Sequence, residues 1–290
     1  MKTDVTDPAF GELKAQLWAH IQQVARDRDP YIASEGHFYV QHYLQENLAR
    51  WGAVEVQQFT VRGQTHQNFL LKLPGQDSKL PPVLVSAHYD AVPGTPGADD
   101  NATGVAVLLE LGRSLSATPA RHPVWLVAFD LEEFGLEGSR HCAAQLYAAG
   151  QRLRLMLSLE MLGYCSAEAN SQRYPADFFR YFYPSEGNFI GLIGNPAIAL
   201  DLQHLSRSLH RVGKVPAHWF PAVNQGKGLP DLRRSDHAPF WDLGYPAVLI
   251  TDTANLRNPH YHQSSDRPET LDLDFLTRVC QGLQHGIQSL

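Results

Sequence analysis

Apolar side chains in the first fifty residues recur at helical spacing. Leu13, Leu17 and Ile21 lie at four-residue steps, and a second amphipathic run covers about residues 35–50. The pattern predicts an N-terminal helical segment at about residues 8–50. The chain then changes character, because short apolar runs replace the amphipathic ones.

These later runs are short, continuously apolar and rich in β-branched residues, as is typical of buried strands. The predicted strands are Val54–Val61, Phe69–Leu73, Val83–Ala87, Val124–Phe129, Leu153–Leu159, Phe189–Ile193 and Ala247–Thr251. Helical spacing predicts helices at about 102–115, 136–149, 197–212 and 271–287. Glycine, proline and polar residues predict loops at 93–100, 164–187 and 214–235.

Buried strands that alternate with helices predict an α/β fold. We expect a three-layer sandwich, with a central, mostly parallel, twisted sheet flanked by helices. The chain carries neither a repeat nor a linker of domain-separating composition. Residues 1–290 are therefore expected to form a single domain.

Composition narrows the function classes. With 24 basic and 30 acidic residues the net charge is −6, which gives no support for a basic nucleic-acid-binding face. No apolar run reaches the roughly 18 residues of a membrane helix. The N-terminal stretch 1–30 is polar and lacks the apolar core of a signal peptide, so we expect a cytoplasmic protein, or a secreted one if the chain is a processed form. Three widely spaced cysteines predict neither a disulfide framework nor a thiolate zinc site.

Acids and histidines gather where the predicted strands end, which is where α/β sheets bind ligands. The residues in question are His88, Asp90, Asp99, Asp100, Glu132, Glu133, Glu160, His260, Tyr261 and His262. Histidine and carboxylate ligands without cysteine suit a catalytic zinc site. Five such ligands, one of them shared, suit two metal ions about 3.5–4 Å apart.

Two spacings assign further roles. His88 and Asp90 lie two residues apart, so both side chains point to the same face of an extended strand. The aspartate can then accept a hydrogen bond from the imidazole nitrogen that faces away from the metal. Glu132 and Glu133 are adjacent and need different roles. One can bind metal while its neighbour acts as general base toward the attacking water.

At this point the sequence resembles the co-catalytic zinc aminopeptidases of metallopeptidase clan MH, family twenty-eight, of the aminopeptidase Y and bacterial leucyl aminopeptidase type. The resemblance covers about residues 80–275, and no His-Glu-x-x-His motif is present. It rests on Ser86-Ala87-His88-Tyr89-Asp90, Pro96-Gly97-Ala98-Asp99-Asp100-Asn101-Ala102-Thr103-Gly104, Glu132-Glu133-Phe134-Gly135-Leu136-Glu137-Gly138-Ser139, Glu160-Met161-Leu162-Gly163-Tyr164, Ser235-Asp236-His237-Ala238-Pro239-Phe240 and Tyr261-His262.

The resemblance implies two zinc ions per chain in a zinc-exopeptidase type of fold. His88, Asp99 and Glu160 would hold one zinc. Asp99, Glu133 and His262 would hold the other, so that Asp99 bridges the pair. The family most often has aspartate where this chain has Glu160.

The same resemblance assigns the remaining site residues. Glu132 would be the general base and acid, and Asp90 would orient the first histidine ligand. Asp100 would follow the bridging aspartate through a cis peptide bond. Tyr261 resembles a tyrosine that some members place against the substrate carbonyl, where a phenol donor stabilises the oxyanion.

Other histidine and aromatic residues are expected near the site without binding metal, or away from it. His237 is expected beside the ligands or at the start of a helix near Ser235, and His260 in the pocket rather than as a ligand. Aromatic residues in the two long predicted loops are expected to pack within those loops rather than to line a pocket. They are Tyr174, Tyr181, Tyr183 and Trp219.

The activity implied is hydrolysis of the N-terminal peptide bond of peptides with a free N-terminus. Glutaminyl cyclase, which has a related fold and one zinc, is the nearest alternative. The Asp99-Asp100 pair and the Tyr261-His262 pair speak against it, because the cyclases tend to lack the double aspartate and carry tryptophan before the last histidine. A catalytically silent binding module of the same fold is a third hypothesis.

Overall fold

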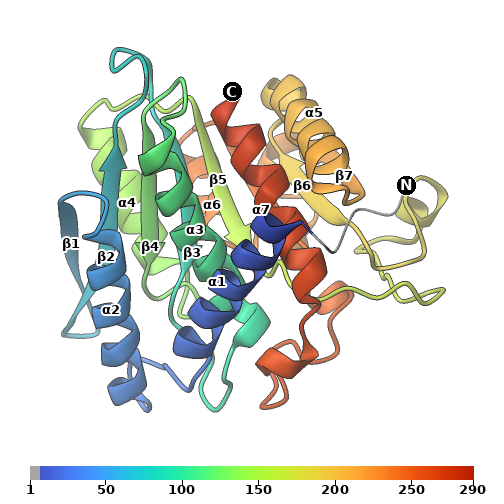
Figure 1. The fold of residues 1–290 in the computed structure, drawn as a ribbon, viewed down its shortest axis with the longest axis horizontal. Helices are drawn as coiled ribbons and strands as arrows, with labels where there is room; N and C mark the ends of the chain where they lie inside the picture. The colour runs from blue at the N-terminus through green and yellow to red at the C-terminus, as the bar shows by residue number, and fades with distance from the viewer. Residues whose placement is uncertain (1–6) are drawn as a thin grey trace.

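The computed structural model describes residues 7–290, in which eight strands form one mixed sheet in the order β1-β2-β4-β3-β5-β8-β6-β7 (Figure 1). The strands are β1 (Val54–Val61), β2 (Gln64–Leu73), β3 (Val83–His88), β4 (Val124–Phe129), β5 (Leu155–Glu160), β6 (Ile190–Gly194), β7 (Ala217–Pro221) and β8 (Ala247–Thr251). The four central strands, β4, β3, β5 and β8, run parallel. Their carboxyl ends therefore meet at one edge of the sheet.

Helices cover both faces of the sheet, which confirms the predicted three-layer α/β fold (Figure 1). One face carries α1 (Pro8–Val24), α2 (Ser34–Leu48), α3 (Gly104–Ala117), α5 (Ala199–Ser208) and α7 (Leu273–Gln288). The other carries α4 (Glu137–Ala148) and the short α6 (His237–Asp242). Within residues 7–290, none of the helices combines the length and the apolar character needed to cross a membrane.

The continuous apolar runs of the central strands are explained by burial on both faces. In β3, Val83 and Val85 belong to the core under the five-helix layer, whereas Leu84 belongs to the core under α4 and α6. This alternation follows from the two-residue repeat of an extended strand. Each such side chain contributes about 1.5–3 kcal/mol when it leaves water.

The outer strands depart from the predicted pattern. At one side β2 is antiparallel to β4 and begins at Gln64, five residues earlier than predicted, because Arg62 and Gly63 both adopt positive φ and close a tight hairpin with β1. At the other side β6 is antiparallel to β8. The edge strand β7 lies inside the predicted loop 214–235, and its half-buried residues carry no clear alternation.

Candidate metal centre and active site

Five side chains converge at the carboxyl edge of the central strands. His88 ends β3 and Glu160 ends β5, while the others come from the loops before α3, after β4 and after β8. Their ligand atoms form two triplets within 4.8 Å of one another, namely His88, Asp100 and Glu160, and Asp100, Glu133 and His262. A third triplet by the same measure joins His88 and Glu133 to the neighbouring Glu132.

Asp100 is the carboxylate common to both triplets. Its Oδ1 lies 3.2 Å from His88 Nε2, and its Oδ2 lies 3.1 Å from His262 Nε2. Glu160 Oε1 approaches His88 Nε2 at 3.5 Å, and Glu133 Oε2 approaches His262 Nε2 at 3.2 Å. Each imidazole nitrogen thus faces two carboxylate oxygens from different parts of the chain.

The donor set fits zinc. His88 Nε2, His262 Nε2 and Glu133 Oε1 are buried and have no hydrogen-bond partner, although oxygen and nitrogen atoms lie close by. Ligand atoms about 2 Å from a tetrahedral zinc lie roughly 3.3 Å apart, which matches the 3.1–3.5 Å separations found here. Closely spaced polar atoms out of hydrogen-bond geometry are what a set of ligands for a common cation presents.

Asp99 lies outside the cluster, so its assignment as the bridging ligand is corrected. Its Oδ1 accepts a hydrogen bond from the Gly163 amide at 2.8 Å, and its Oδ2 accepts one from Asn258 Nδ2 at 2.7 Å. The shared position belongs to the next residue. The cis peptide bond is likewise one residue further along, between Asp100 and Asn101, rather than between Asp99 and Asp100.

Asp90 lies beside His88 and also organises the two adjacent glutamates. Its Oδ1 is 3.4 Å from His88 Nδ1 and accepts a hydrogen bond from the Glu132 amide at 3.1 Å. Its Oδ2 accepts one from the Glu133 amide, also at 3.1 Å. One carboxylate therefore fixes the turn that carries both glutamates and lies against a histidine of the cluster.

The centre is strongly acidic, and its pKa values reflect this. Burial raises the pKa of Glu132 well above its usual range, with Glu160 and Glu133 adding to the rise and His88 opposing it. Burial also raises the pKa of Glu133 to about 7. Burial alone would lower the pKa of His262, but Asp100 and Glu133 raise it to about 10.

The remaining predicted site residues are distributed around this cluster. Tyr261 stacks on the His262 ring at 3.7 Å, and its hydroxyl oxygen accepts a hydrogen bond from Arg234 Nη2 at 2.9 Å. His260 lies outside the cluster and pairs with Ser265 through Nδ1. His237 starts α6 as a buried core residue whose ring packs against Trp241, while its Nε2 donates to the Leu232 carbonyl. Burial lowers the pKa of His237 to about 3, so it is neutral.

Three residues that support the cluster were missed. Ser235 Oγ donates to Glu160 Oε2 at 2.7 Å. Asp266 accepts hydrogen bonds from the amides of Asp99 and Asp100, and Arg28 binds carbonyl groups of the same loop. Ser235 opens one of the motifs that carry the resemblance, but the motif does not indicate its contact with Glu160. A lone aspartate or arginine in a polar segment carries no signal in the sequence.

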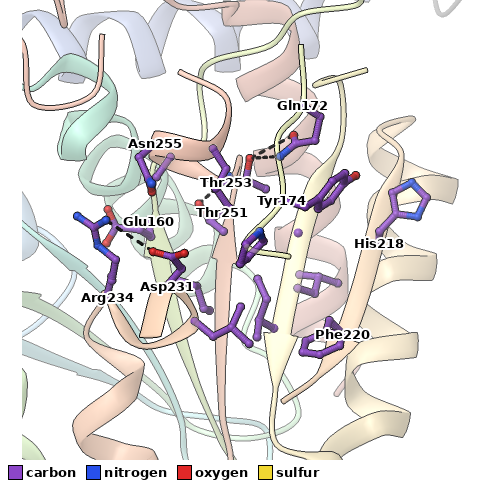
Figure 2. Close-up of a pocket in the computed structure, with 18 of the residues that line it drawn as sticks. Glu160, Gln172, Tyr174, His218, Phe220, Asp231, Arg234, Thr251, Thr253 and Asn255 are labelled. Atoms are coloured by element: carbon purple, nitrogen blue, oxygen red, sulfur yellow. Dashed lines mark hydrogen bonds and ion pairs between the residues drawn. The ribbon is translucent and has the colours of Figure 1, made fainter. Parts of the chain in front are cut away.

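A pocket opens next to the cluster, with Glu160 and Tyr261 in its wall. Figure 2 shows Glu160, Asp231 and Arg234 on one side of it, and the rings of Tyr174, His218 and Phe220 on the other. The wall comes from strands β6 and β7, the end of β8, and the segments 172–183, 231–235 and 253–256. The cavity measures about 120 Å³.

Two of the aromatic residues expected to pack only within loops line this pocket. Tyr174 donates its hydroxyl proton to the Pro184 carbonyl at 2.6 Å, and Tyr183 donates to the Trp219 carbonyl at 3.1 Å. With their polar ends satisfied by backbone, both phenols present ring surface as walls. Phe179 packs between them and Phe220.

Comparison with known proteins agrees with the resemblance seen in the sequence. The sequence model of "Peptidase family M28" matches residues 68–285. The chain is similar to the YfbL protein of Escherichia coli K12, with 31% identity over 252 residues, covering 83% of this chain and 76% of YfbL.

Solved structures share the fold. A zinc aminopeptidase from Bacillus subtilis superimposes with a TM-score of 0.59 and 25% identity, covering 78% of this chain and 50% of that one. The glutaminyl cyclase of Tannerella forsythia superimposes with a TM-score of 0.67 and 22% identity, covering 96% of this chain and 98% of that one. The α/β fold is thus common to peptidases and cyclases.

Proposed function

Because this chain belongs to peptidase family M28, we propose that it is a zinc-dependent aminopeptidase that hydrolyses the N-terminal peptide bond of peptides. The observation that carries the proposal is the shared position of Asp100. Its two oxygens face His88 and His262, which belong to different triplets. Two zinc ions are the occupants that such a shared carboxylate suits.

Each zinc would be held by one triplet. His88, Asp100 and Glu160 would hold the first, and Asp100, Glu133 and His262 the second. Zinc at this centre supplies Lewis-acid polarisation of the scissile carbonyl and lowers the pKa of water. Everything else in the reaction falls to the side chains of the protein.

Glu132 is placed to move the proton. It is buried beside the cluster, and its carboxyl group has a raised pKa, so it can accept a proton from the attacking water and retain it. The same carboxyl oxygen then returns the proton to the leaving amine, which completes the addition of water across the carbon–nitrogen bond.

Tyr261 is placed to stabilise charge on the substrate carbonyl oxygen. Its hydroxyl oxygen accepts from Arg234, which leaves the phenolic proton free to donate. A donor aimed at the developing oxyanion contributes to the transition state more than to the ground state. Burial raises the pKa of Tyr261, so the phenol keeps its proton.

The pocket beside Glu160 suits the side chain of the N-terminal residue. Rings and aliphatic groups line much of it, whereas Glu160 lies on one side with Asp231 and Arg234, which pair with each other at 3.9 Å. A cavity of about 120 Å³ is close to the engineered cavity of roughly 150 Å³ that binds benzene. We therefore expect a large apolar N-terminal residue, such as phenylalanine, to be preferred.

Narrowing this pocket should reverse the preference. A Cβ on Gly191 would meet its neighbours at 3.5–3.6 Å, which is ordinary contact, so the strand has space for a side chain there. Gly191→Val is expected to lower kcat/KM for phenylalanyl-nitroanilide by about 10- to 200-fold and to spare alanyl-nitroanilide. Phe182→Ala, in the segment that precedes β6 but 76% exposed and outside the pocket, is the control. Equal losses on both substrates in Gly191→Val would contradict the assignment of the pocket.

Glutaminyl cyclase activity is the second candidate, favoured by the full-length likeness to the Tannerella enzyme. The pocket opposes this activity. The side-chain amide of Gln172 already binds Arg257 and Thr253, so it is not free to bind the amide of a substrate glutamine. The other walls of the pocket are largely apolar. A peptide with N-terminal glutamine separates the two reactions. A cyclase releases ammonia from it, whereas an aminopeptidase releases free glutamine.

Zinc removal tests the proposed function directly. Purified protein is expected to release nitroaniline from aminoacyl-nitroanilides, to lose this activity on dialysis against a chelator, and to regain it with two equivalents of zinc. Metal analysis and activity would be measured on the same samples. Nitroaniline release that survives removal of all metal would overturn the proposal, and a full recovery with one equivalent would overturn the two-ion centre.

A further inference from the structure

Arg28 is a buried cation joined to the loop that carries Asp100. It lies between α1 and α2, ahead of the residues that match the family, and its side chain is 0% exposed. Its Nε donates to the Tyr89 carbonyl at 2.8 Å, and its Nη2 donates to the carbonyls of Gly97 at 2.9 Å and Asp100 at 3.2 Å. A further bond from Nη1 reaches the Pro96 carbonyl.

The acceptors of this guanidinium are main-chain carbonyls, of which three belong to the stretch 96–100. Burial of a charge without a directly bonded carboxylate is costly. Burial accordingly lowers the pKa of Arg28, while the fields of Asp100 and Asp266 raise it. The acidic centre thus offsets the cost of the buried cation, and the planar fork supplies several donors in fixed directions.

The Asp100 peptide is held from two sides. The Asp266 carboxylate accepts from the Asp99 amide at 2.9 Å and from the Asp100 amide at 3.1 Å, while Arg28 binds the Asp100 carbonyl. Such contacts fix the direction in which the Asp100 side chain leaves the backbone. Partners of this kind behind a metal ligand typically change metal affinity by about 10–100-fold.

Gly97 provides independent evidence that the loop is shaped around the fork. Its φ of +57° favours glycine, and a Cβ there would lie 2.9 Å from both terminal nitrogens of Arg28 and overlap the Asp100 carbonyl oxygen. A side chain at Gly97 would therefore separate the Arg28 guanidinium from the Asp100 carbonyl. Substitutions at Gly97 and at Arg28 thus disturb the same contact from opposite sides.

We propose that Arg28 is a positioning residue that holds the shared carboxylate Asp100 in place and so sets the zinc affinity of both metal positions together. This inference rests on the proposed metal centre. If it is correct, loss of Arg28 weakens the binding of both zinc equivalents. Loss of Glu160 or His262, in contrast, removes a ligand from one triplet only.

The test is zinc binding by Arg28→Met, Arg28→Lys and Gly97→Ala, measured by competition with a chromophoric chelator. Arg28→Met and Gly97→Ala are expected to weaken both equivalents by about 10–100-fold, and Arg28→Lys by less, because it keeps the charge but loses the fork. His262→Ala serves as the comparison in which one equivalent weakens. Arg154→Gln, which removes an ion pair with Asp201 on a different part of the surface, is the control for a generic loss of stability.

The outcomes separate the explanations. Wild-type affinity at both equivalents in Arg28→Lys and Gly97→Ala, with only a lower melting temperature, would overturn the proposal in favour of a structural role. Weakening of one equivalent alone would overturn the route through Asp100. If Arg28→Met fails to fold, the other two variants decide. If the wild-type protein binds a single zinc ion, the proposed two-zinc centre is wrong. The role of Arg28 is then tested by whether its variants bind that one ion more weakly than the wild type, and unchanged affinity would overturn it.

Discussion

Glu132→Gln is expected to lower kcat/KM for aminoacyl-nitroanilides by about 10²–10⁴-fold, the usual contribution of a general acid–base group. The amide keeps the shape of the side chain but cannot take a proton from water. Zinc content should stay at the wild-type level, because the two triplets proposed to hold zinc keep all their ligands and Glu132 belongs only to the third triplet, with His88 and Glu133. Steady-state rates and metal analysis on the same preparation check both statements.

A control substitution distinguishes the loss of a proton-transferring group from the loss of a negative charge. Glu137→Gln removes the same charge five residues further on, at the start of α4 and outside the two triplets. It is expected to change kcat/KM by less than about twofold, as surface substitutions usually have small effects. Equal activity in the Glu132 and Glu137 variants would remove Glu132 from the mechanism.

The second large effect is expected at Asp100. An asparagine in its place offers one oxygen, so it cannot serve His88 and His262 at once. Asp100→Asn should therefore weaken zinc binding by more than about 100-fold, since even partners behind a ligand cost about 10–100-fold. Zinc titration with a competing chelator measures this loss.

Asp99→Asn is the informative neighbour. The two carboxyl oxygens of Asp99 accept from the Gly163 amide and from Asn258, so an amide would leave one buried donor without an acceptor. We expect a loss of about 1–3 kcal/mol in the free energy of unfolding, with both zinc equivalents retained. Loss of zinc in Asp99→Asn but not in Asp100→Asn would restore the original assignment of the bridge.

The fold was predictable because the central strands are buried on both faces. Continuous apolar runs such as Val83–Ala87 have few alternative interpretations, and the parallel strand ends then gather His88, Glu133 and Glu160 at one edge. The edge strand β7 was not predictable, because a half-buried edge has neither continuous nor alternating apolar positions.

The sequence does not distinguish Asp99 from Asp100 as the shared carboxylate. Both are acidic, adjacent and buried. Which of them points at the histidines depends on the backbone of residues 97–101, and that backbone is fixed by Arg28 and Asp266 from distant parts of the chain. Spacing along the sequence carries no information on contacts of this kind. The pocket walls from Tyr174 and Tyr183 were missed for the same reason, since strand β6 and its neighbours bring them together only in the folded chain.

The reversal of β6 relative to β8 brings two different parts of the chain to the same edge of the sheet. Because β6 is antiparallel, its first residues, Ile190 and Gly191, arrive at the edge where the parallel strands deliver their last ones. The segment 164–187, which precedes β6, therefore reaches the pocket, whereas most residues of the metal-binding cluster come from the earlier parallel strands and the loops around them. Insertions or replacements within 164–187 are therefore expected to reshape the pocket and to leave the five clustered side chains in place.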